Sequence, residues 1–125
     1  MTTLNITRIG AAAMAGIAAI HLLLAPEYFG EQAYLGVLFL LGAGAGALVA
    51  MRLWRGGGTA SWALGVVVAA GMGVGFVLSR TVGLPGFHEG EWEMSGVISV
   101  LLETLFVGAA AVATLRPRLV STMAD

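Results

Sequence analysis

Two ionisable side chains, His21 and Glu103, stand inside long apolar stretches of the 125-residue sequence, and Arg80 closes a third stretch. An ionisable group in such surroundings costs several kcal/mol unless it is paired or reached by water, so each one marks a candidate site. Glu103 follows Met94, the first residue of its stretch, by nine positions, which places it about 13 Å along a helix. The sequence therefore predicts that these three side chains meet near one end of a helical bundle.

Each of these groups has a structural and a functional interpretation. Glu103 could pair with Arg80 or stay protonated and bond a neighbouring carbonyl, and it could instead bind a cation or carry a proton. His21 could be a hydrogen-bonded packing residue or a ligand of a metal or cofactor, since neutral imidazole is a common ligand. Residues that lie three and four positions apart share one face of a helix. This spacing predicts a face of small and polar residues that points into the bundle. This face holds Trp92, Gly96, Ser99 and Glu103.

The stretch 80–93 carries further candidate ligands. It is longer than the two to eight residues that usually connect helices, and its apolar Leu84 and Phe87 predict that it folds back over the bundle as a lid. Imidazole and carboxylate groups here could bind a divalent metal, although no spacing matches a named metal motif. The alternative is a solvated acidic loop with an aromatic anchor. The candidate ligands are His88, Glu89, Glu91 and Glu93 with His21 and Glu27, and the favoured set is His21, His88, Glu91 and Glu93.

The same residues carry a resemblance. His21-x4-Pro26-Glu27, then Arg80-Thr-x-Gly-Leu-Pro, an acidic stretch and Glu103 together resemble a group of small four-helix bacterial membrane proteins. The resemblance spans most of the chain and rests on short motifs, and no activity is attached to the group. It implies a signature of His21, Pro26, Glu27, Arg80, Gly83, Leu84, Pro85 and Glu103.

The composition excludes several classes of site. With no cysteine, the chain has no disulfide, no thiol chemistry and no cysteine-ligated zinc or iron–sulfur centre. All six basic residues are arginine and form no patch with aromatic residues, so nucleic acid is not an expected partner. The run 56–58 is a glycine turn without the Lys-Ser/Thr of a phosphate-binding loop, and no nucleotide is expected.

The elements that position these residues are apolar helices. The chain is 58% hydrophobic and only 10% charged, with a mean hydropathy of +0.93, whereas soluble domains carry about 25% charged residues. Its solvent must therefore be lipid. A helix needs about 20 apolar residues to cross the hydrocarbon core, and a single transmembrane domain over 1–125 with four crossing helices is predicted. Their expected bounds are 6–25, 33–54, 60–79 and 94–115.

Small residues at a spacing of four predict where these helices touch. The pairs Gly42/Gly46 and Gly71/Gly75, and more weakly Ala12/Gly16, would let helix backbones approach closely inside one bundle. Self-association through the same faces is the alternative.

Arginine placement predicts the orientation of an up-down bundle. Basic residues in short loops are retained in the cytoplasm, and five of the six arginines fall on the side of the two termini. We expect a bacterial inner-membrane protein with both termini in the cytoplasm and the long 80–93 loop outside. The first stretch ends without a suitable cleavage site and is expected to be retained. The five arginines are Arg8, Arg52, Arg55, Arg116 and Arg118.

Two functions follow from these features. The small size and the scarcity of charge inside the membrane favour a non-catalytic accessory subunit of a larger membrane protein complex. The alternative is an outward-facing protein that binds or transports a metal ion or small ligand through His21, Glu27, Arg80 and Glu103. An enzyme with Glu103 and His21 as acid and base comes third, with quinone or lipid chemistry as the place to look.

Overall fold

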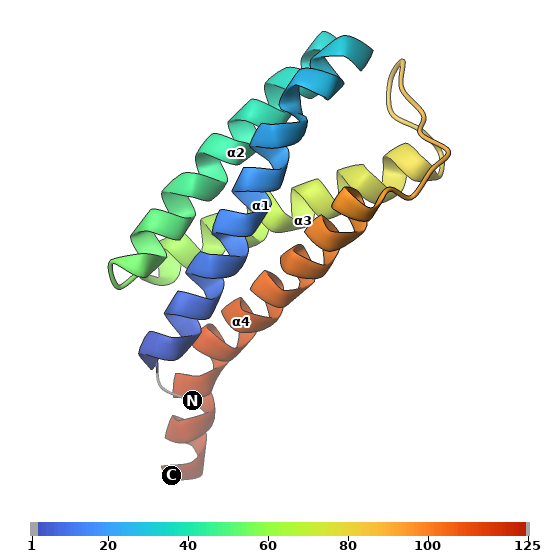
Figure 1. Ribbon diagram of the computed structural model, residues 1–125. Coiled ribbons are helices and arrows are strands. Elements are labelled where there is room, and N and C mark those ends of the chain that lie inside the picture. Colours follow the sequence, from blue (N-terminus) through green and yellow to red (C-terminus); the bar gives the residue numbers. More distant parts are fainter. Residues whose placement is uncertain (1–2, 125) are drawn as a thin grey trace.

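The computed structural model describes the backbone of residues 3–124 and the side chains of residues 3–115. Every regular element in this part of the chain is a helix, and all four helices are long and apolar enough to cross a membrane. The predicted all-helical fold with four apolar helices is therefore confirmed. The helices are α1 (Thr3–Glu31), α2 (Ala33–Trp54), α3 (Thr59–Arg80) and α4 (Met94–Ala124) (Figure 1).

The helix bounds agree closely with the prediction for α2 and α3 and differ from it at both ends of α1 and at the end of α4. α2 has the expected bounds, and α3 is one residue longer at each end. α4 begins at Met94 as expected and continues to Ala124. α1 starts three residues early and runs six residues beyond its expected end, so the expected connection to α2 shrinks to Gln32.

Pro26 lies inside α1 rather than ending it. A proline inside a helix lacks the N–H that would bond the carbonyl four residues earlier, and its ring crowds that carbonyl, at a cost of about 3 kcal/mol. Ala25 and Tyr28, on either side, are buried, so packing holds this part of α1 helical. Beyond it the N–H of Gln32 donates to the carbonyl of Tyr28 at 3.0 Å, and the carbonyl of Gln32 accepts from Leu35 at 3.1 Å. α1 and α2 thus join in a tight turn.

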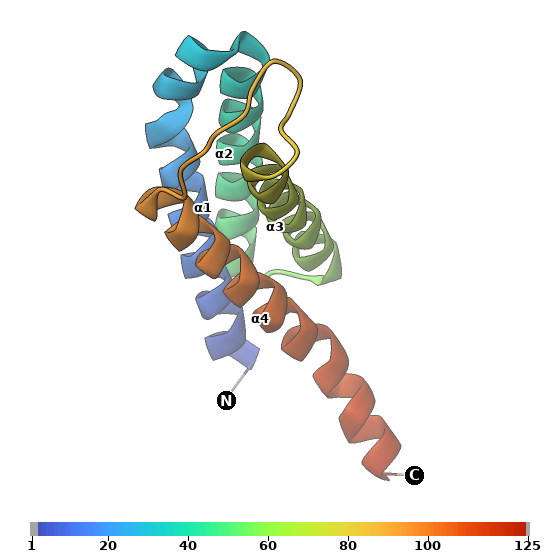
Figure 2. The same ribbon diagram turned by 90° about the vertical axis from the view of Figure 1, so that its right-hand side faces the viewer.

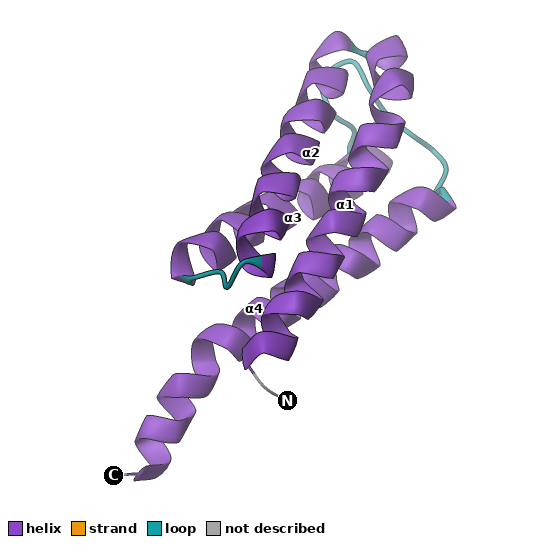
Figure 3. Cartoon of the chain, turned by 60° about the vertical axis from the view of Figure 1, so that its left-hand side comes forward, coloured by secondary structure: helices purple, strands orange, loops and turns teal. Residues whose placement is uncertain are grey.

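The four helices form a ring in which each packs against its neighbours in sequence and α4 closes back on α1. Successive helices run in opposite directions, so the start of α1 and the end of α4 lie at one end of the bundle (Figures 1 and 2). We call this the terminal end. The opposite end, where residues 81–93 connect α3 to α4, is the loop end (Figure 3). α1 and α2 pack most extensively, and α2 and α3 least.

Two separate apolar clusters hold the ring together. The larger one fills the terminal half, where Met14, Ile17, Val49, Leu53 and Phe106 are the most deeply buried side chains. The smaller one lies at the loop end. It consists of Tyr28, Leu35 and Phe87, with Leu24, Phe39 and Leu84 packed around them. The space between the two clusters is where the candidate site lies.

The 81–93 segment folds back toward the turn between α1 and α2. Its tight turn pairs Leu84 and Phe87 through both backbone N–H groups, at 2.7 and 2.9 Å. This turn needs glycine, because Gly83 and Gly86 adopt φ values of 91° and 66°, a region that side chains disfavour. Side chains from the α1–α2 turn tie it down. Gln32 donates to the carbonyl of Gly86 at 2.9 Å, and Tyr34 donates to that of Pro85.

Candidate functional site

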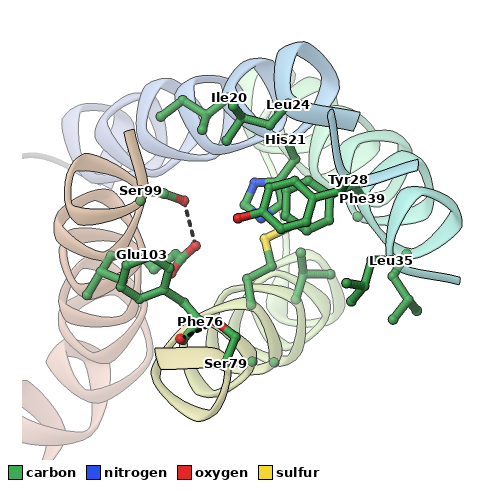
Figure 4. A pocket seen from close by; sticks show the side chains of 18 of the residues that line it. Ile20, His21, Leu24, Tyr28, Leu35, Phe39, Phe76, Ser79, Ser99 and Glu103 are labelled. Carbon is green, nitrogen blue, oxygen red and sulfur yellow. Dashed lines mark hydrogen bonds between the residues drawn. The ribbon is translucent and has the colours of Figure 1, made fainter. Parts of the chain in front are cut away.

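A cavity of about 470 Å³ lies between the two apolar clusters and is lined by all four helices (Figure 4). Leu84 and Phe87 of the 81–93 segment complete the lining. Most of its wall is aliphatic or aromatic, with a small number of polar groups. A mostly apolar concave site with few polar groups is typical of small-molecule sites. The polar side chains in the wall are His21, Tyr28, Ser79, Arg80, Ser95, Ser99 and Glu103.

Glu103 is the most unusual of these groups. Its side chain is 5% exposed, and one carboxyl oxygen, Oε2, accepts a hydrogen bond from the hydroxyl of Ser99 at 2.8 Å. The other oxygen, Oε1, is buried and has no hydrogen-bond partner. A Cβ added at Gly73 of α3 would lie 3.4 Å from Oε1, so α3 passes this oxygen without a side chain. A buried polar atom left unpaired costs about 1–3 kcal/mol, and the residue that carries it belongs to the wall of the cavity.

Arg80 closes α3 at the loop end of the same cavity and is also buried. Its guanidinium donates to the hydroxyls of Ser79 at 2.7 Å and Tyr28 at 3.3 Å, and to the backbone carbonyl of Glu91 at 3.2 Å. Its charge also lies over the ring of Phe76, 4.2 Å from the centroid. None of these partners is a carboxylate. The pairing of Arg80 with Glu103 considered from the sequence is therefore not formed.

His21 occupies the α1 side of the cavity (Figure 4). Its Nδ1 lies 2.9 Å from the carbonyl oxygen of Ile17. Because a carbonyl can only accept, Nδ1 carries a proton, and in the neutral ring Nε2 is then an acceptor. The ring packs against Phe39 with centroids 4.9 Å apart. The cavity thus offers a second acceptor besides Glu103.

The other residues predicted for a site lie elsewhere. Glu27 is exposed on α1 and is not part of the cavity wall. His88 is exposed, and its Nε2 donates to the carbonyl of Thr81 at 3.0 Å. Glu91 is exposed, and its backbone N–H donates to the Glu89 carboxylate at 3.2 Å. Among the described side chains, no three His, Cys, Asp or Glu residues lie close enough to hold a metal ion. The structure does not gather the favoured set His21, His88, Glu91 and Glu93.

The predicted inward face of the last helix is present for three of its four members. Gly96, Ser99 and Glu103 are buried and line the cavity. Trp92 precedes the start of α4 and is 56% exposed, with its ring edge against Phe76. The helical spacing failed for Trp92 because the helix begins two residues later.

The glycine pairs behave differently from one another. Gly42 and Gly46 of α2 are close to neighbouring helices, since an added Cβ would meet Met72 and Ala18 respectively. Gly71 and Gly75 of α3 have nothing within 4 Å of such a Cβ, and both line the cavity. The second pair therefore leaves open space instead of bringing helices together, contrary to the sequence-based expectation.

Three polar residues of the wall, Tyr28, Ser79 and Ser95, are not among the residues that the sequence predicts for a site. Tyr28 follows His21 by seven residues, two helical turns, and so shares its face of α1. That spacing was an available signal, but the expected end of α1 at residue 25 hid it. Ser79 was counted as the last residue of an apolar helix, and nothing in its neighbours distinguishes it.

Comparison of the chain with protein-family models, curated proteins and solved structures finds no match in any of the three. The function has to be argued from the geometry of the cavity itself.

Proposed function

We propose that this protein binds a small, mostly apolar molecule in the cavity at its loop end. The observation that carries the proposal is the unpartnered, buried Oε1 of Glu103, a residue that lines a cavity of about 470 Å³. Buried polar atoms in folded proteins almost always have a partner, and an exception needs an explanation. A ligand that supplies the missing hydrogen bond is that explanation.

The charges around the cavity favour a neutral ligand with a hydroxyl group. Among the described side chains no carboxylate pairs with Arg80, so its positive charge opposes a cationic ligand in the same cavity. Glu103, when ionised, opposes an anionic one. A neutral hydroxyl can donate to Oε1 of Glu103 or to Nε2 of His21, and it can accept when the carboxyl is protonated. The aromatic rings of Phe39 and Phe76, which line the cavity, suit an apolar body.

The proposal includes an orientation. The arginines Arg8, Arg52 and Arg55 belong to the terminal end and favour its retention in the cytoplasm. Arg116 and Arg118 support the same direction by sequence, although their side chains lie outside the described residues. The loop end, and with it the cavity, would then face outward from a bacterial inner membrane.

A matched pair of probes tests this proposal. 2-Naphthol has a hydroxyl on an apolar ring system, and 2-methoxynaphthalene has the same rings without a donor. In detergent-solubilised protein we expect 2-naphthol to raise the melting temperature and to bind more tightly than its methyl ether. The preference should be about tenfold, because an unsatisfied buried acceptor costs roughly 1.4 kcal/mol or more.

Substitutions assign the effect to Glu103. In Glu103→Met the side chain keeps its length and loses its oxygens. The preference for 2-naphthol over its methyl ether should then fall to about the preference with which the two probes partition into detergent micelles alone. Glu27→Met is the matched control, since Glu27 is exposed and outside the cavity wall, and it should retain the preference. Equal binding of both probes by the wild type, or a full preference in Glu103→Met, would show that Glu103 does not recognise a ligand.

The accessory role expected from the composition remains a prediction. Nothing in the geometry of the bundle bears on it, whereas the cavity and its unpartnered carboxyl bear directly on ligand binding.

A further inference from the structure

We infer that the ligand reaches the cavity sideways from the lipid, through a gap between α2 and α3, and is therefore a membrane-dissolved amphiphile. This inference rests on the proposed function and goes beyond it by naming the route and the source of the ligand.

The exposed part of the cavity wall identifies the gap. The cavity is lined by all four helices, but the lining residues that are exposed all belong to α2 and α3. Leu38 and Leu41 of α2 are 56% and 64% exposed, and Val67 of α3 is 68% exposed. A residue can line a cavity and also be this exposed only where the cavity reaches the surface. The α2–α3 gap is defined by Leu38, Leu41, Val67 and Gly71.

The arrangement of the helices explains why the cavity opens there. α2 and α3 lie side by side near their connection at the terminal end and diverge toward the loop end (Figure 1). They are also the least extensively packed neighbours in the ring. Gly71 and Gly75, one helical turn apart, leave space on the α3 side. Met72 reaches across to Gly42, but methionine is flexible and can move aside.

The other route, from the water at the loop end, is covered. Phe87 is buried against Tyr28, with ring centroids 5.6 Å apart, and Leu84 packs beside it. Gln32 and Tyr34 hold the same turn through its backbone carbonyls. Leu84 and Phe87 thus form a roof that closes the cavity toward water, whereas the α2–α3 gap is edged by aliphatic residues.

The chemistry of the gap fits a lipid source. Its edges are leucine, valine and glycine, groups that face hydrocarbon without cost in a helix that crosses a membrane. A water-soluble ligand would have to cross this apolar edge or displace the roof. An amphiphile dissolved in the bilayer meets neither barrier. Its hydroxyl can give up hydrogen bonds in the headgroup region and form new ones with Glu103 or His21.

Larger side chains in the α2–α3 gap test this route, because they narrow the gap and leave the polar groups of the cavity unchanged. Gly71→Leu and Gly75→Leu each place a side chain where an added Cβ meets nothing within 4 Å. Gly44→Leu is the control, since Gly44 is an exposed α2 glycine with equally open surroundings and no place in the cavity wall. Stopped-flow fluorescence of 2-naphthol, with the protein in lipid nanodiscs, gives the association and dissociation rates. We expect both rates to fall by roughly tenfold in the gap variants, so that Kd changes less than either rate.

The outcomes separate this inference from the proposed function. Wild-type rates in both gap variants, or a weaker Kd caused only by faster dissociation, would overturn the lateral route while leaving binding intact. A double variant that loosens the roof, Gln32→Ala with Tyr34→Phe, should leave association unchanged, and faster association there would assign the route to the loop end. A wild-type protein that binds no 2-naphthol would overturn the proposed function itself, whatever the route.

Discussion

Two glycines of the same helix, Gly65 and Gly71, should respond in opposite ways to a single added methyl group. Gly65 lies in the packed terminal half, where a Cβ would lie 2.5 Å from Cε1 of Phe106 and 3.0 Å from Cγ1 of Val49. Carbon atoms in ordinary contact are about 3.5–4.0 Å apart, so the Phe106 ring would have to move by about 1 Å. That ring is fully buried and packs against Trp62 with centroids 5.4 Å apart, which leaves it little room.

The magnitudes follow from this difference. Overpacking of a buried site costs about 1–3 kcal/mol, and we expect this loss for Gly65→Ala. Gly71→Ala adds a methyl group to open space, and alanine favours a helix over glycine by up to about 1 kcal/mol. Gly65→Ala gains the same helix propensity, so the free energies of unfolding of the two variants should differ by the overpacking alone, about 1–3 kcal/mol.

Reversible unfolding in mixed dodecyl maltoside and SDS micelles, followed by tryptophan fluorescence, measures this difference. Gly44→Ala is the control for helix propensity at an exposed glycine with nothing within 4 Å of an added Cβ. If Gly71→Ala lost as much stability as Gly65→Ala, α3 would be packed along its whole length. The cavity would then be absent in the membrane protein, and the proposals built on it would fail together.

Two further substitutions test the groups that border the cavity. Tyr28→Phe removes the hydroxyl that accepts from Arg80 at 3.3 Å but keeps the ring stacked on Phe39 at 4.1 Å. It should cost about 1 kcal/mol in the same unfolding assay, and no loss would mean that this hydrogen bond is not formed. Phe106→Ala empties the centre of the larger cluster and should cost about 3–5 kcal/mol. A loss below about 1 kcal/mol would contradict the burial of Phe106 between the helices.

The sequence predicts the helices well because lipid imposes a strong condition on them. A crossing segment must be long and apolar, and it satisfies its own backbone hydrogen bonds, so composition alone locates it. The predicted end of α1 at Pro26 is wrong, because the cost of a proline inside a helix is outweighed by the burial around it. Part of that burial is the stacking of Tyr28 on Phe39 of α2, a contact that cannot be seen in α1 alone.

The candidate site is predictable only in part. The sequence predicts a site from His21, Arg80 and Glu103 because they are ionisable groups in or at the end of apolar segments, and all three line the same cavity. Their individual partners were not predictable, because Arg80 bonds Tyr28 and a backbone carbonyl instead of Glu103. The open surroundings of Gly71 and Gly75 depend on how far α3 diverges from α2. A spacing of four residues does not contain that information.

In our proposal a ligand hydroxyl completes the hydrogen bonding of Glu103. A structure of the protein with 6-bromo-2-naphthol tests it most directly, since bromine can be located by its anomalous scattering. We expect bromine density inside the cavity, with the ligand oxygen within hydrogen-bond distance of a Glu103 carboxyl oxygen or of Nε2 of His21. Bromine found only at the lipid-facing surface, with the cavity collapsed around Glu103, would contradict it.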